Sequence, residues 1–114
     1  MNYRVIVKRL ASRDLQAALE YYAVIRENLK DDLLVEVSKV FMLLEENPMR
    51  RASDLNGIYQ IAINRFPYII SYVIEGNQVF IIAILHERRR PTFRTKRLEQ
   101  DGQQVDRIRD KTSQ

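Results

Sequence analysis

The side chains that could carry out acid–base or phosphate chemistry lie in the second half of the sequence, around its single histidine. Cleavage of RNA requires a group that takes the proton from a 2′-hydroxyl, a group that protonates the leaving oxygen, and fixed positive charge where the phosphorane develops. Arg65, His86 and Arg89 are of the required types and are the catalytic candidates if the chain cleaves RNA. Glu87, and either Tyr68 or Tyr72, could supply further acid–base groups.

Each of these residues also has an ordinary structural role. A neutral histidine at the end of a buried strand commonly hydrogen-bonds to the backbone, which is the alternative for His86. Arg65 lies in a predicted turn, where solvation or a salt bridge to Glu75 or to a helix acid is the alternative. Tyr68 and Tyr72 are four residues apart in a predicted strand, so their rings share one face and could simply pack in the core.

Positive charge is concentrated in one short segment. Residues 87–97 hold six basic side chains and one acid, whereas the rest of the chain has 13 basic residues against 14 acids. Such a concentration suits an acidic protein, nucleic acid or a machine bound to nucleic acid, although a solvated surface is the simpler alternative. The candidates for binding a target or partner are Arg65, Tyr68, His86, Arg88, Arg89, Arg90 and Arg94.

Composition restricts the other classes of site. The 114 residues contain no cysteine, one histidine and three glycines, without a glycine-rich phosphate loop or an acidic cluster suited to a divalent metal. No disulfide is possible, and no metal or cofactor is implied. No apolar run approaches the roughly 18 residues that cross a bilayer, and the sequence does not open on a signal peptide, so we expect a cytoplasmic protein.

The positions of apolar residues predict the elements that hold these side chains. Residues 3–8 alternate as a strand, and a helix is expected to begin near Arg13, with Ser12 as its cap and Asp14 complementing its positive end. A polar connection over 28–32 leads to a second helix that ends at Asn47-Pro48. Three segments rich in β-branched and aromatic residues then predict strands over 58–63, 68–74 and 79–85.

These elements predict an α+β fold in the order β-α-α-β-β-β, an antiparallel sheet packed against an N-terminal helical hairpin. The strand over 79–85 is apolar on both faces, so it should lie inside the sheet and be covered on each side. The hairpin can cover one face, and the other needs a different cover. Residues 92–114 form a polar, charged C-terminal tail that is either helical or partly disordered.

Three stretches of the sequence resemble the toxins of the RelE/ParE superfamily, the plasmid-stabilisation type II toxins, and are closer to ParE than to RelE. They are Leu-Asn-Gly-Ile-Tyr at 55–59, Arg-Phe-Pro-Tyr-Ile-Ile-Ser-Tyr at 65–72 and Ile-Leu-His-Glu-Arg-Arg-Arg-Pro at 84–91. The resemblance covers roughly residues 3–91 and implies a toxin domain over 1–91, with 92–114 as a separate tail. ParE-like chains often have an acid where this sequence has Arg90.

The resemblance implies that the protein is the toxin of a type II toxin–antitoxin system. A ParE-like toxin would inhibit DNA gyrase by protein binding, without catalysis, and would form a hetero-oligomer with a cognate antitoxin. The first alternative is a RelE-like ribosome-dependent mRNA endonuclease, in which the ribosome and mRNA are the partners. RelE-like ribonucleases usually carry an arginine near the end of the second strand, where this sequence has Ala62. The second alternative is an inactive relative that only binds its partner.

Overall fold

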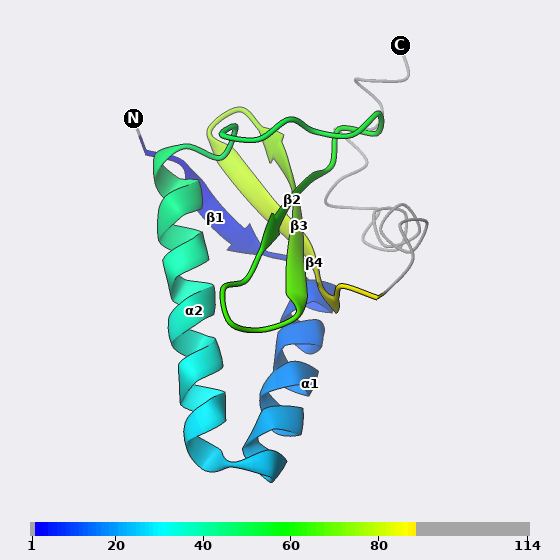
Figure 1. The fold of residues 1–114 in the computed structure, drawn as a ribbon. Helices are drawn as coiled ribbons and strands as arrows, with labels where there is room; N and C mark the ends of the chain where they lie inside the picture. Colours follow the sequence, from blue (N-terminus) through cyan, green and yellow to red (C-terminus); the bar gives the residue numbers. More distant parts are fainter. Residues whose placement is uncertain (1, 89–114) are drawn as a thin grey trace.

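The computed structural model describes residues 2–88 and has the predicted α+β order (Figure 1). Its elements are β1 (Arg4–Val7), α1 (Arg9–Ile25), α2 (Glu27–Glu46), β2 (Tyr59–Ala62), β3 (Tyr68–Glu75) and β4 (Gln78–His86). The tail predicted over 92–114 lies outside the described residues. Within the part of the chain that is described, no helix combines the length and apolar character needed to cross a membrane.

The four strands form one mixed sheet in the order β1-β4-β3-β2. The expected antiparallel pairing holds for β2 with β3 and for β3 with β4, whereas β1 runs parallel to β4, with Val5 opposite Val79. Alternation of apolar and charged residues predicts that a strand forms but does not give its direction. Parallel neighbours require a long connection, and here α1, α2 and two strands separate β1 from β4.

The two helices pack on one face of the sheet and create the main core there (Figure 1). Leu33, Val37 and Leu44 of α2 are buried against Ile70 and Ile81 of the sheet. As predicted, the apolar segment of β4 is buried on both faces. A second cluster occupies the opposite face without contributions from the described helices; it comprises Ile58, Val73, Phe80, Ile82, Ala83 and Leu85, with Ile6 packed against it.

The predicted start of the first helix, near Arg13, and the predicted connection over 28–32 are both wrong. The first helix begins at Arg9, so Ser12 is not its cap, and the backbone N–H of Ser12 donates to the Lys8 carbonyl at 2.9 Å. The second helix begins at Glu27, leaving only Arg26, which has an extended backbone, between the helices. Residues 27–32, which are polar except for Leu29, form the first turns of α2 instead of a loop, because side chains on this solvent-facing end of the hairpin do not need to be apolar.

Asp14 holds the end of β4 to α1. Its carboxylate accepts a hydrogen bond of 3.0 Å from the backbone N–H of Ile84. The pairing of β1 with β4 ends at Val7 and Ile81, so this carboxylate reaches the β4 edge beyond the point where β1 stops. The residue expected to complement the start of the helix therefore connects the helix layer with the sheet.

Replacing Asp14 with alanine is expected to lower the free energy of unfolding by about 1.5–3 kcal/mol, the range for hydrogen bonds to charged groups. The Ile84 amide would lose its acceptor at a site that is partly buried. Urea unfolding of the variant measures the change. Replacement of Asp31, an exposed aspartate of α2, with alanine is the control and should shift stability by less than about 0.5 kcal/mol. Equal stability of both variants would contradict the assigned role.

Candidate functional site

The predicted site residues that the structure describes lie where β3 begins and β4 ends, and we call this region the rim, defined as residues 65–68 and 86–88. Tyr68 pairs with His86 in the β3–β4 register. The backbone N–H of Glu87 donates to the Pro67 carbonyl at 2.9 Å, which continues the contact beyond the strands. Antiparallel pairing thus joins two sequence motifs that are separated by the whole β3–β4 hairpin.

Aromatic rings connect the rim to the helix layer. The ring centroid of Tyr22, from α1, lies 5.1 Å from that of Phe66 and 6.2 Å from that of Tyr68, and the Tyr68 ring lies 5.6 Å from the ring of His86. All three contacts are edge-to-face, a favourable arrangement for aromatic rings. Burial raises the pKa of Tyr22, and the nearby Tyr68 and Tyr21 add to the effect, so its phenol keeps its proton at neutral pH.

His86 is bound to the backbone of its own turn. Its Nδ1 accepts a hydrogen bond of 3.2 Å from the backbone N–H of Arg88, and the ring is half-buried. An accepting Nδ1 places the proton of the neutral ring on Nε2. The structure therefore shows the backbone role that was the alternative to catalysis, and it places Arg88, which is exposed, at a fixed position beside the histidine.

Arg65 belongs to the rim by its backbone, but its guanidinium lies against α2. Nη2 is 3.4 Å from Oδ2 of Asp32 and Nη1 is 3.8 Å from Oε2 of Glu36. The residue has a left-handed backbone with φ of 74°, which non-glycine residues seldom adopt. Two helix acids therefore balance this positive charge, as in the structural alternative, and the acid predicted as the other partner, Glu75, is not one of them.

The structure brings Tyr68, His86 and Arg88 together at the rim. Tyr68 and Tyr72 both belong to the helix-facing core, as their spacing predicts. Of the remaining candidates, Arg89, Arg90 and Arg94 lie outside the described residues, so their roles remain predictions. The described rim therefore offers the half-buried imidazole of His86 and the exposed Arg88, whereas the guanidinium of Arg65, also exposed, is already engaged by α2.

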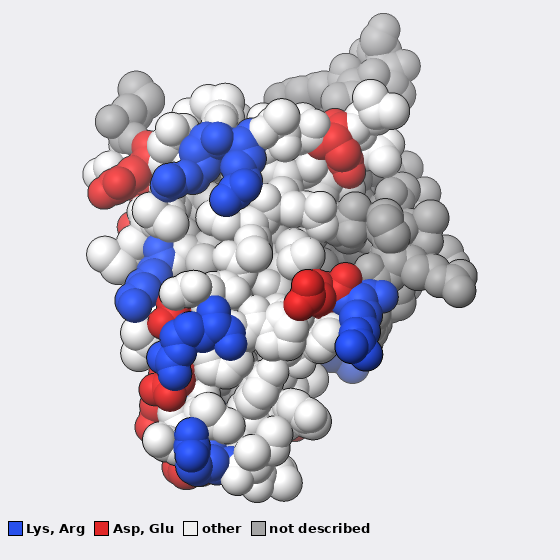
Figure 2. All heavy atoms as spheres, in the orientation of Figure 1, with Lys and Arg blue, Asp and Glu red and all other residues white. Residues whose placement is uncertain are grey.

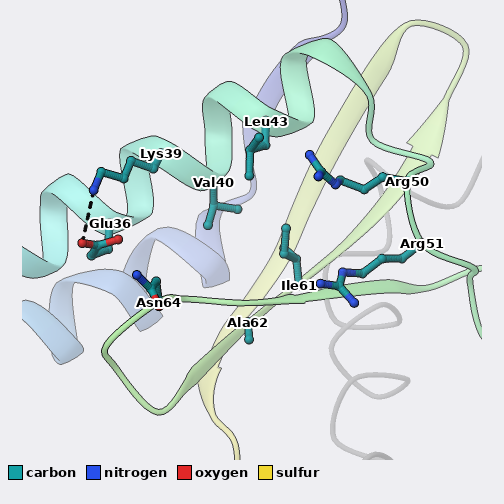
Figure 3. A pocket seen from close by; sticks show the side chains of 9 residues that line it. All are labelled: Glu36, Lys39, Val40, Leu43, Arg50, Arg51, Ile61, Ala62 and Asn64. Atoms are coloured by element: carbon teal, nitrogen blue, oxygen red, sulfur yellow. Dashed lines mark hydrogen bonds and ion pairs between the residues drawn. The ribbon is translucent and has the colours of Figure 1, made fainter.

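A second surface, which we call the groove, lies between α2 and β2 and was missed in the sequence (Figure 3). It is a hollow of about 280 Å³ lined by Glu36, Lys39, Val40, Leu43, Arg50, Arg51, Ile61, Ala62 and Asn64. On the face shown in Figure 2, basic side chains gather over the segment that follows α2. The signal in the sequence is the pair of arginines after Asn47-Pro48, which is a weaker concentration of charge than the basic run at 87–97.

Comparison with known proteins gives the family. Residues 5–91 match the family described as the ParE toxin of the type II toxin–antitoxin system, parDE. Among solved structures, the fold resembles a chain of the chromosomal ParDE TA system from P. aeruginosa, with a TM-score of 0.65 and 17% sequence identity over 74% of this chain and 95% of that chain. No protein with a curated description matches the sequence. Because the match extends over the helical hairpin and nearly all of the sheet, the chain belongs to the ParE toxin family of type II toxin–antitoxin systems.

Proposed function

We propose that this chain is a toxin that inhibits DNA gyrase by protein binding in the cytoplasm and that a cognate antitoxin neutralises it by forming a hetero-oligomer with it. The observation that carries the proposal is the family match over residues 5–91, which includes every described helix and nearly all of the sheet. On this basis we propose for this chain the functions expected of a ParE-like toxin.

The contacts at the rim support binding over RNA cleavage. Nδ1 of His86 is engaged by the Arg88 amide, and the Arg65 guanidinium lies against Asp32 and Glu36. A cleavage site needs an acid, a base and a cation converging on one phosphate. His86 and Arg65 instead contact separate partners. Position 62, where RelE-like ribonucleases usually have an arginine, is an exposed alanine of β2.

Charge supports an electrostatic contribution to the proposed association. The six basic residues within 87–97 follow β4 directly and contain the excess positive charge of the chain. Such a concentration speeds encounter with a negatively charged partner and makes the association sensitive to salt. An antitoxin with an acidic surface could cover the same charges, which would account for neutralisation by direct competition.

A supercoiling assay with purified gyrase and the full chain tests the proposal. We expect supercoiling to decrease as toxin is added and to recover when the antitoxin, the product of a neighbouring reading frame, is added in equimolar amount. Intact supercoiling at saturating toxin would refute gyrase inhibition. Primer extension on cellular mRNA after brief induction separates the alternatives, since codon-positioned breaks would identify a RelE-like ribonuclease. Normal growth after induction would identify an inactive relative.

A further inference from the structure

We propose that the C-terminal tail, residues 92–114, packs on the second face of the sheet, the face opposite the helices, and belongs to the same domain as the sheet. The second face is defined by the cluster of Ile58, Val73, Phe80, Ile82, Ala83 and Leu85. The inference does not depend on gyrase being the target. It assigns this face to the chain itself, which leaves the rim and the outer side of the helices for partners.

The second face is buried, although it lies away from the helices. Ile82 and Ala83 are fully buried within the single chain, and Phe80 is nearly so. Lys8, whose Nζ lies 5.7 Å from the centroid of the Phe80 ring, is only 2% exposed, which is rare for a lysine. A sheet buries an apolar face by packing it against another layer. Some further part of the chain therefore covers this one.

Within residues 2–88, neither the helices nor the long loop supplies this layer. The apolar side chains of α1 and α2 belong to the cluster on the other face, as Leu33 and Leu44 do. The loop between α2 and β2 keeps its large apolar side chains in solvent, since Met49 and Leu55 are both exposed. Ile6 packs against the second cluster from within the sheet itself. The part of the chain that remains for a cover is the tail.

An irregularity in strand pairing enlarges the apolar area to be covered. Ser71 lies opposite Ala83 and Tyr72 lies opposite Ile81, so Ile82 is an extra residue of β4. Because of this bulge, two consecutive side chains, those of Ile82 and Ala83, both belong to the second cluster. Since β4 is an inner strand, the cluster lies in the middle of the sheet. The cover must therefore extend across the face, beyond the reach of a contact at one edge.

The tail has the length and the side chains that such a cover needs. It follows β4, the inner strand that contributes most of the cluster. Leu98, Val105 and Ile108 recur at intervals that place them on one side of a helix. A helix over 92–108 would be about 25 Å long, and β4 itself spans roughly 26 Å between its first and last residues. One helix laid back along β4 would thus cover the face from end to end.

Thiol labelling tests the cover in the full chain, which has no cysteine of its own. Ala83→Cys places one thiol in the second cluster, and its reaction with DTNB under native conditions should be slow. Adding Val105→Asp and Ile108→Asp should speed this reaction more than about tenfold, because carboxylates are costly to hold on an apolar face and the cover opens. The matched control Gln103→Asp, Gln104→Asp makes the same change in net charge and should leave the rate unchanged.

A second reporter shows whether the two aspartates act locally. Ala18→Cys places the thiol in the helix-facing core, where it should stay protected in both tail variants. Equal reaction of Ala83→Cys with and without Val105→Asp and Ile108→Asp, or a fast reaction with the intact tail, would overturn the inference. A rate that rises when the protein is diluted would identify a second copy of the chain as the cover and would also overturn it.

A spin label locates the tail without changing its apolar residues. A nitroxide on Gln104→Cys should broaden the methyl NMR signals of Ile82 and Leu85 more than those of Leu33, in the helix-facing core. The same label on Ser38→Cys, at an exposed position of α2, is the control and should show the reverse order. If the variant with two aspartates unfolds and exposes both thiols, this measurement decides alone. Stronger broadening of Leu33 by the label at position 104, or no broadening in either core, would overturn the inference.

Discussion

Replacing Tyr72 with alanine is expected to lower the free energy of unfolding by about 3–5 kcal/mol, the cost typical of removing a large buried aromatic side chain. Among residues 2–88, Tyr72 is the largest fully buried side chain, and it belongs to the core between the helices and the sheet. Its ring stacks on that of Tyr59 at 5.3 Å, and its hydroxyl donates to the Pro48 carbonyl at 2.7 Å. It therefore joins β3, β2 and the end of α2, and its loss should affect all three.

Phenylalanine at position 72 separates the hydrogen bond from the packing. Tyr72→Phe keeps the ring but leaves the Pro48 carbonyl without its donor, which should cost about 1–3 kcal/mol. Urea unfolding of both variants measures the two contributions. Tyr21→Phe is the matched control, because the Tyr21 side chain is 60% exposed and should tolerate loss of the hydroxyl. If Tyr72→Phe unfolds at the same urea concentration as the wild type, the hydrogen bond does not stabilise the fold.

The same tyrosine should make stability depend on alkaline pH. Burial raises the pKa of Tyr72 above its ordinary value of 10.0, and Tyr59 adds to the effect, whereas Arg51 and Arg50 oppose it. Because the folded state holds the phenol proton more tightly than the unfolded state, this stabilisation is present below pH 10.0 and is lost as pH rises through the folded-state pKa. We expect stability to fall more steeply above pH 10.0 in the wild type than in Tyr72→Phe.

The sheet was predictable because its strands are marked by local chemistry. The segments that became β3 and β4 are rich in β-branched and aromatic residues, and the turn at Gly76 separates them. Gly76 has a φ of 60°, a left-handed conformation that glycine adopts without steric cost. Such signals act within a few residues, so a single sequence reveals them. The parallel direction of β1 was not predictable, because it depends on how the helices return the chain to the sheet.

Contacts between elements that are distant in the sequence could not be predicted from local sequence signals. Asp14 has the position and charge of a residue at a helix start, yet its carboxylate bonds to Ile84, 70 residues away. A salt bridge from Arg65 to Glu75 or to a helix acid was one alternative, but the sequence does not indicate which acids its guanidinium would meet, and they are Asp32 and Glu36 of α2. These pairings follow from how the hairpin lies across the sheet, which is a property of the assembled fold.

Reversing the charges of Arg88, Arg89 and Arg90 to glutamate is expected to abolish gyrase inhibition, weakening it by more than about a hundredfold at low salt. Arg88 is exposed, and its backbone N–H donates to Nδ1 of His86 at the end of β4. Arg88, Arg89 and Arg90 are consecutive in the sequence and are half of the six basic residues of 87–97. Supercoiling assays across a toxin titration, at low and at physiological salt, measure the loss.

A matched variant distinguishes local contact from net charge. Arg4→Glu, Arg50→Glu, Arg51→Glu makes the same change in net charge, but Arg4 lies opposite Gln78 at the other end of β4 and the other two arginines line the groove. If the proposed gyrase contact is at the rim, this variant should inhibit gyrase nearly as well as the wild type at physiological salt, where long-range attraction is screened over about 8 Å. Equal loss of gyrase inhibition in both variants would mean that overall charge drives the association, and it would refute a specific contact at the rim. Full inhibition by the Arg88, Arg89 and Arg90 variant would exclude these arginines from the interface.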